Sequence, residues 1–106
     1  MRSKLDWIED WEARARMAHY RARELARLCT VSDRQLRRHF MKHFGTPPQE
    51  WIDQLRMKES RHLLLRGCSV KETAYQLDFK HPSRFCEAFK REFGTTATSV
   101  IEQRLR

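Results

Sequence analysis

The chain has 106 residues, enough for one domain or two very small ones and too few for a large enzyme core. Lys and Arg number 22 against 14 Asp and Glu, and the net charge of +8 favours a polyanionic partner. Nucleic acid is the leading candidate, and an anionic membrane surface is the competitor. No apolar run is long enough to span a membrane and residues 1–10 lack a signal-peptide pattern, so we expect a cytosolic protein.

Helix-forming residues dominate the chain, and only three Gly and three Pro interrupt them. Short breaks rich in capping or turn residues fall at residues 30–32, 45–48, 67–69, 79–82 and 94–96. This pattern predicts an all-α chain of about seven helices. Residues 12–27 contain no Gly, Pro, Ser or Asn, so we expect a bend near His19 or Tyr20 to separate two helices there.

Several helix ends can be predicted from single residues. Ser32 and Ser69 suit N-cap positions, and Glu72, three residues after Ser69, completes a capping box. Gly45 and Gly94 suit the ends of two helices.

The sequence repeats itself. Residues 24–28 correspond to residues 72–76 at an offset of 48, and residues 36–46 correspond to residues 85–95 at an offset of 49. Each copy consists of a short helix, a tight turn and a second helix that ends in Gly, which is the plan of a helix-turn-helix unit. The change of offset indicates one extra turn residue in the second copy. Two copies predict two recognition helices.

Between the copies, Pro48 suits a first helical turn and apolar residues recur at helical spacing. We therefore expect three segments. An N-terminal helix and the first helix-turn-helix unit occupy residues 1–47, a long linker helix occupies residues 48–66, and the second unit with a C-terminal helix occupies residues 67–106.

The second helix of each copy has one apolar stripe and one polar surface. In the first copy, Leu36, Phe40 and Phe44 share a stripe, and basic residues point away from it. In the second copy, the surface opposite Phe85 and Phe89 mixes both charges. We expect the aromatic residues to lie in the core. A basic run is usually only a solvated helix surface, but its place within a repeated helix-turn-helix favours binding.

Together these segments resemble the DNA-binding domain of the AraC/XylS family of bacterial transcription regulators. The resemblance covers residues 22–100 and is carried by residues 24–32, 36–40, 45–48, 56–64, 69–79 and 85–94. It implies sequence-specific binding of double-stranded DNA, with two recognition helices in adjacent major-groove segments about one turn apart, ~10 bp. It also implies a monomeric, nucleoid-associated activator or repressor with RNA polymerase as a candidate partner, no cofactor and no enzymatic activity.

Each recognition helix would then carry base-contacting and phosphate-contacting residues. By their position in the family pattern, the residues at base edges are Arg34, Arg37 and Arg38 in the first helix and Ser83, Cys86 and Glu87 in the second. The residues at phosphates are Ser32, Gln35 and Lys42 in the first unit and Arg84, Lys90 and Arg91 in the second. Arg pairs well with guanine, and Glu87 can accept a hydrogen bond from cytosine N4.

The sequence departs from the family pattern at several positions. Thr30 and Asp78 replace the usual turn glycines, and Arg21 replaces an N-cap Ser or Thr. Glu87 stands where a basic residue is common, and Ala97 replaces a common proline. We therefore expect the second unit to contribute more to positioning than to specificity.

Two other classes of function stay open. The fold could serve as a protein-interaction or anti-regulator module with weak or nonspecific DNA binding. The net charge alone would also suit nonspecific architectural or RNA binding. Most members of the family carry a further sensing or dimerisation domain, so the chain is either a stand-alone regulator or a C-terminal domain.

No catalytic or metal-binding pattern is recognisable. Cys29, Cys68 and Cys86 are widely spaced, which is typical of reduced thiols, and no His or Cys pair has zinc-finger spacing, so we expect no metal site. Trp7 and Trp11 are expected to share one face of a first helix packed on the domain.

Overall fold

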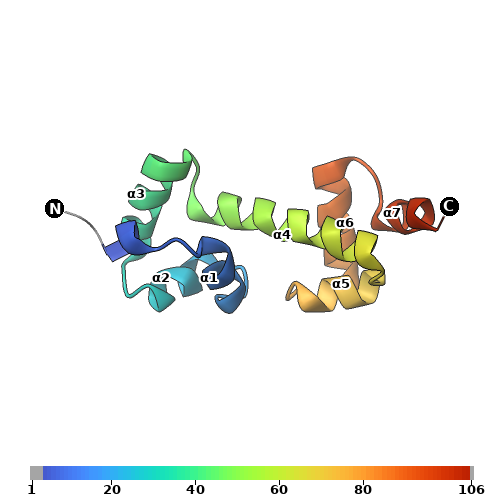
Figure 1. Cartoon of the computed structure of the whole chain (residues 1–106), viewed down its shortest axis with the longest axis horizontal. Coiled ribbons are helices and arrows are strands. Elements are labelled where there is room, and N and C mark those ends of the chain that lie inside the picture. The colour runs from blue at the N-terminus through green and yellow to red at the C-terminus, as the bar shows by residue number, and fades with distance from the viewer. Residues whose placement is uncertain (1–3, 106) are drawn as a thin grey trace. The chain divides into compact units, whose positions relative to one another are not determined.

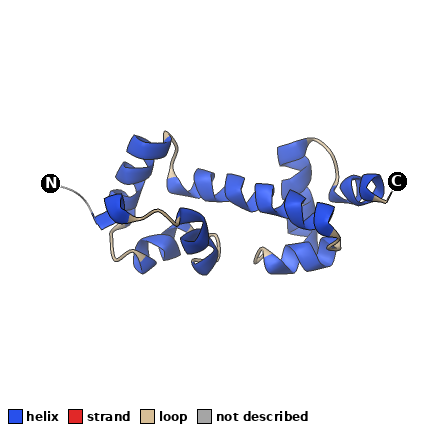
Figure 2. Cartoon of the chain, in the orientation of Figure 1, coloured by secondary structure: helices blue, strands red, loops and turns tan. Residues whose placement is uncertain are grey.

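The computed structural model describes residues 4–105. Within this range the chain forms only helices, and no strand is present (Figures 1 and 2). The elements are a 3₁₀ turn η1 (Lys4–Trp7) followed by α1 (Trp11–Met17), α2 (Ala22–Leu28), α3 (Asp33–Phe44), α4 (Pro48–Arg66), α5 (Val70–Gln76), α6 (Pro82–Phe93) and α7 (Ala97–Arg104). The predicted all-α fold with about seven helices is confirmed. None of the described helices has the length and apolar character needed to cross a membrane.

The chain divides into two compact units, residues 1–55 and residues 56–106. The boundary falls inside α4, so the first part of this helix belongs to the first unit and the rest to the second. The three-segment division expected from the sequence stays a prediction.

In the first unit, α2 packs against both α1 and α3. Leu25 of α2 and Phe40 of α3 are fully buried, and the ring of Trp11 meets Phe40 edge-on at a centroid distance of 4.9 Å. Phe44 departs from the predicted core, since it is 40% exposed at the end of α3. Its ring still packs against Phe40 and Trp51.

The expectation that Trp7 and Trp11 share one helical face is wrong. The segment Lys4–Trp7 is a separate 3₁₀ turn, and α1 begins only at Trp11. Trp11 is buried, whereas Trp7 is 71% exposed. Leu5 takes the buried position of the 3₁₀ turn instead.

In the second unit, α6 packs against α5 and α7. Its core consists of Met57, Leu64, Ala74, Phe85, Phe89, Ala97 and Val100. Two side chains hold helix ends in place. Arg56 of α4 donates from Nε to the carbonyl oxygen of Leu77 after α5, at 2.8 Å, and Arg104 donates to the carbonyl oxygen of Leu64 near the end of α4.

The two helix-turn-helix turns share one backbone pattern. After α2, the N–H groups of Thr30 and Val31 donate to the carbonyls of Arg27 and Ala26. After α5, Asp78 and Phe79 make the same bonds 48 residues later. This is the Schellman arrangement, which requires a left-handed residue after the helix. Thr30 and Asp78 have φ of 54° and 61°. The two residues that replace the usual turn glycines therefore adopt the left-handed conformation that glycine would have there.

The bend between α1 and α2 is confirmed, with φ of 55° at His19 and 60° at Tyr20. Arg21 is the N-cap of α2 and makes no side-chain cap hydrogen bond, as its residue type predicts. Gln49 of α4 supplies the missing acceptor, since its Oε1 takes a hydrogen bond from the Ala22 N–H at 2.9 Å. Its Nε2 donates to the carbonyl oxygen of Tyr20.

The predicted caps are also confirmed. Ser69 and Glu72 form the capping box of α5, and Ser32 caps α3 with Gln35 as its capping-box partner. Gly45 and Gly94 end α3 and α6 in the left-handed conformation that their sequence positions predict.

The strained turn at Thr30 predicts a stabilising substitution. A left-handed conformation costs an L-residue about 1–2 kcal/mol, and the greater freedom of unfolded glycine offsets part of the relief, so Thr30→Gly should raise the free energy of unfolding by about 0.5–1 kcal/mol. Equilibrium urea unfolding measures the change. Thr30→Ala is the control, because it removes the same hydroxyl and keeps the strain. An equal loss of stability in both variants would contradict the prediction.

A buried hydroxyl predicts a second stabilising change. Thr73 is fully buried at the position that corresponds to Leu25 in the first copy, and no hydrogen-bond partner for its Oγ1 lies among the described residues. A buried unpaired polar group costs about 1–3 kcal/mol, so the isosteric Thr73→Val should stabilise the chain by about 1 kcal/mol.

Urea unfolding again provides the measurement, with Ser60→Ala as the control. Ser60 is equally buried, but its Oγ donates to the carbonyl oxygen of Met57 at 2.6 Å, so its removal should not stabilise the chain. A loss of stability on Thr73→Val would contradict the assignment of an unpaired hydroxyl.

Candidate nucleic-acid interface

The second helix of each unit is held in place by an apolar stripe. Leu36 and Phe40 of α3 are buried in the first unit, and Phe85 and Phe89 of α6 are buried in the second. Residues 29–32 join α2 to α3 and residues 77–81 join α5 to α6, so the predicted extra residue in the second turn is confirmed. Because the buried stripe fixes the rotation of each helix about its axis, it also fixes which residues face solvent.

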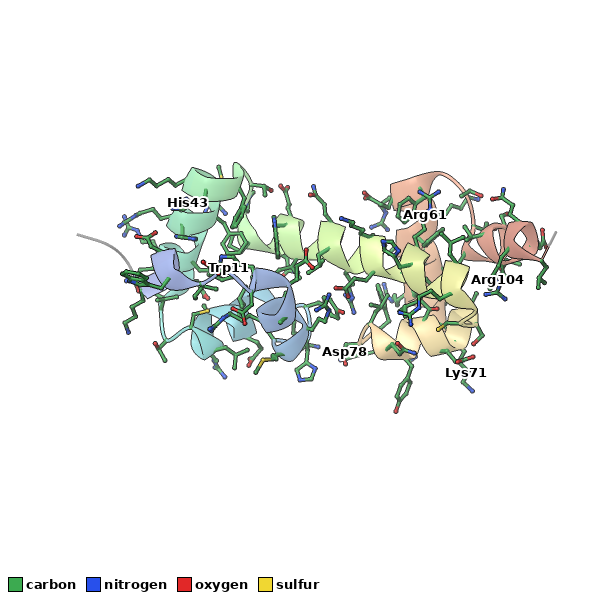
Figure 3. All side chains as sticks on the ribbon, viewed as in Figure 1. Trp11, His43, Arg61, Lys71, Asp78 and Arg104 are labelled. Carbon is green, nitrogen blue, oxygen red and sulfur yellow. The ribbon has the colours of Figure 1, made fainter. Side chains whose placement is uncertain are left out.

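The solvent-facing surface of α3 is basic. Arg34, Arg37, Arg38 and Lys42 are all exposed, and Asp33 is the single acidic residue of the helix. None of these four basic side chains has an ion-pair partner within residues 4–105. Figure 3 shows long side chains extending from α3 into solvent. Several unpaired positive charges on one helix create a local positive potential that attracts phosphate.

Ser32 and Gln35, predicted to contact phosphate, lie at the start of this helix. Both side chains serve the cap: Ser32 Oγ accepts from the Gln35 N–H at 3.1 Å, and Gln35 Oε1 accepts from the Ser32 N–H at 2.9 Å. The hydroxyl hydrogen of Ser32 and the amide N–H groups of Gln35 stay free of these two bonds. Both groups can donate hydrogen bonds, and phosphate oxygens accept them.

The matching surface of α6 has a different chemistry. At the offset of 49 residues, Ser83, Cys86 and Glu87 replace the three arginines of α3. Ser83 and Glu87 are exposed, whereas Cys86 is half-buried. The small neutral side chains and the carboxylate remove most of the positive charge at the positions predicted to face bases.

The remaining predicted residues of α6 keep some positive charge. Arg84, Lys90 and Arg91 are exposed, and α6 carries these three basic residues with Glu87 and Glu92. Glu87 follows Arg84 by three positions and precedes Arg91 by four, a spacing at which opposite charges attract on a helix. Glu87 therefore weakens the attraction of α6 for phosphate, whereas the one acidic residue of α3, Asp33, lies at the start of that helix among four basic residues.

The three cysteines of the chain are free. Cys29 is buried at the end of α2, and this burial raises the pKa of its thiol although nearby Arg14 acts in the opposite direction. A protonated buried thiol is a weak nucleophile.

The structure also brings together three residues that the sequence prediction did not connect. His39 and His43 lie one turn apart on α3, and both face Asp6 of η1. His39 and His43 are four residues apart, which is a spacing of zinc-ligand pairs, so the expectation that no His pair has such a spacing is wrong. The contact with Asp6, 33 residues before His39, depends on how η1 folds back on α3.

Comparisons with known proteins agree with this arrangement. A family model described as a helix-turn-helix domain matches residues 25–103. The HTH-type transcriptional regulator GlxA of Rhizobium meliloti is 39% identical over 77 residues, covering 72% of this chain and 24% of that protein. The HTH-type transcriptional activator RhaS of Salmonella arizonae is 31% identical over 106 residues, covering 92% of this chain and 34% of that protein.

The chain thus spans about a third or less of the length of these two relatives. Among solved structures, an AraC-type transcriptional regulator from Chromobacterium violaceum matches with a TM-score of 0.75 and 23% identity, covering 97% of this chain and 93% of the other. That match shows the fold. With the helix-turn-helix match over most of its length, the chain belongs to the AraC family of transcription regulators, as its sequence resemblance predicted.

Proposed function

We propose that the chain binds double-stranded DNA in a sequence-specific manner and regulates transcription, with α3 and α6 as recognition helices in adjacent major-groove segments. The observation that carries this proposal is the exposed, unpaired basic surface of α3, the second helix of a helix-turn-helix unit. In such units the second helix enters the major groove, and its outward side chains reach base edges. RNA polymerase is the candidate protein partner, and a monomer is the expected binding form.

Within α3, we assign the two tasks by side-chain chemistry. Arg34, Arg37 and Arg38 supply planar guanidinium groups, which can donate two hydrogen bonds to O6 and N7 of one guanine. Lys42, with Ser32 and Gln35 at the cap, supplies donors to phosphate oxygens, which position the helix without reading sequence. The buried Leu36 supports this assignment, because it turns Arg34 and Arg38 to the opposite side of the helix, with Arg37 beside them.

The second unit reads fewer bases in this proposal. Glu87 accepts a hydrogen bond from cytosine N4, and Ser83 and Cys86 make small neutral contacts. Arg84, Lys90 and Arg91 hold the backbone. Because Glu87 also repels phosphate, binding by α6 depends more on a favourable base than binding by α3 does.

The competing function is a protein-interaction or anti-regulator module on the same fold. The observation that favours it is the α6 surface, where Glu87 and a half-buried Cys86 replace two arginines of the first copy. This alternative requires that DNA binding be weak and independent of the α3 arginines.

Selection of binders from a random duplex library at near-physiological salt tests the proposal. We expect a motif with two half-sites about one helical turn apart, ~10 bp. Arg34→Ala, Arg37→Ala and Arg38→Ala should each relax specificity in one half-site only and cost about 1–3 kcal/mol on the selected site, roughly a 5- to 150-fold loss of affinity.

Two further variants control this experiment. Lys42→Ala should weaken binding to all duplexes alike and reduce the slope of log affinity against log salt by about 1. Lys58→Ala removes one exposed positive charge from α4, outside both recognition helices, and should leave the motif intact. Binding with no enriched motif, or binding unaltered by Arg38→Ala, would overturn the proposal and favour nonspecific binding or the interaction module.

Glu87 provides a separate prediction for the second half-site. A glutamine side chain pairs well with adenine, whereas glutamate accepts from cytosine, so Glu87→Gln should shift the preferred base at one position from cytosine to adenine. Loss of the negative charge should also raise affinity for unrelated duplexes. Repeating the selection with this variant provides the measurement. An unchanged motif would show that Glu87 does not face a base.

A further inference from the structure

We propose that Asp6, His39 and His43 form a binding site for Zn²⁺ on the first helix-turn-helix unit. The site joins the 3₁₀ turn η1 to the C-terminal half of α3. It is independent of the proposed DNA contacts, since none of its residues is assigned to a base or a phosphate.

The helical spacing of the two histidines is the first argument. Residues four apart on a helix lie on the same face, and two histidines at this spacing form a common pair of zinc ligands. The ring centroids of His39 and His43 are 4.2 Å apart, so the two rings already lie next to each other.

The distances to Asp6 are the second argument. Asp6 Oδ1 lies 3.7 Å from His39 Nδ1 and 3.5 Å from His43 Nε2, and one ligand atom from each of the three residues lies within 4.8 Å of the others. Tetrahedral zinc with bonds of 2.0–2.1 Å holds its ligand atoms about 3.3 Å apart. The two separations from Asp6 Oδ1 are therefore close to those of a filled site and longer than the hydrogen bonds of a charged pair, which are about 2.7–2.9 Å.

The protonation of His39 is consistent with metal binding. Burial lowers its pKa, the neighbouring His43 and Lys42 act in the same direction, and Asp6 opposes them. A neutral imidazole has the lone pair that a metal requires, whereas a protonated imidazole does not. The ring is held beside Trp11, at a centroid distance of 5.5 Å, so it loses little freedom on binding.

Other contacts hold Asp6 near α3 before any metal binds. Leu5 next to it is 1% exposed. Lys4 donates from Nζ to the carbonyl oxygen and to Oγ1 of Thr30, at 3.4 and 3.3 Å. These contacts anchor η1 on the helix-turn-helix, so the carboxylate does not have to be recruited from a free chain.

The donor set selects the type of metal. Two imidazole nitrogens and one carboxylate suit Zn²⁺, while Mg²⁺ and Ca²⁺ prefer oxygen ligands alone. Three protein ligands leave the fourth tetrahedral position to water. A bound ion would also connect η1 to α3 directly and resist its detachment.

The test uses the full chain purified without a polyhistidine tag and titrated with ZnCl₂ by calorimetry. We expect saturable binding of one Zn²⁺ per chain, and at least a tenfold loss of affinity in both His43→Ala and Asp6→Asn. These two residues are exposed, so their replacement should leave the fold intact, which circular dichroism verifies. His62→Ala, which removes an exposed histidine from α4, should bind as the wild type does.

Co²⁺ serves as a second probe, because its visible absorption reports the coordination geometry. We expect a tetrahedral spectrum in the wild type that is lost in His43→Ala, and no competition from Mg²⁺. Equal affinity in wild type and both site variants would overturn the proposal. So would loss of affinity in His43→Ala without a loss in Asp6→Asn, because the carboxylate would then not be a ligand.

Discussion

The burial of one apolar stripe on the second helix of each unit is the constraint on which the rest of this structure depends. Phe40 and Phe89 are fully buried, and truncation of such a side chain typically costs about 3–5 kcal/mol. That energy holds each helix at one rotation about its axis. A rotation that exposed Phe40 would also bury part of the Arg34–Lys42 surface, and buried unpaired charge is costly. Core packing and the exposed chemistry of α3 are therefore two results of the same constraint.

The repeated unit tolerates large sequence changes because its essential geometry is carried by the backbone. The same Schellman bonds close the turn after Cys29 and the turn after Leu77, although the left-handed residue is Thr30 in one and Asp78 in the other. Both residues accept some strain there, and Asp accepts it more easily than the β-branched Thr. The second turn also accommodates an extra residue. What the two copies share is thus the set of hydrogen bonds at the end of the first helix.

The sequence predicted those features that depend on local patterns. Apolar periodicity located the helices, and capping residues located the starts of α3 and α5. The features that it missed depend on contacts between distant residues. Gln49 caps α2 across 27 positions, and Asp6 reaches His39 across 33. No local pattern connects such pairs, because their proximity follows from how η1 and α4 pack.

The assignment of Trp7 was wrong for a related reason. A spacing of four residues places Trp7 and Trp11 together only if both lie in one helix, and the chain leaves helical geometry between them. Leu5, the neighbouring apolar residue, fills the buried position. The error shows that periodicity predicts a shared face only within a continuous helix, and residues 4–11 contain no Gly or Pro to reveal the break.

The two copies have diverged in both their cores and their surfaces. The first copy has Leu25 where the second has the buried Thr73, and it has three exposed arginines where the second has Ser83, Cys86 and Glu87. Under the proposed function, the first unit supplies most of the electrostatic attraction and reads bases with its exposed arginines. The second unit carries an unpaired hydroxyl in its core and a carboxylate on its surface. A unit with less to gain from nonspecific phosphate contacts discriminates more sharply when it does bind, since a wrong base leaves the Glu87 carboxylate desolvated and unpaired, at a cost of about 1–3 kcal/mol or more. Because Glu87 weakens phosphate binding by α6 and makes it depend on the correct base, we assign the second unit a larger share in specificity than its departures from the family pattern predicted.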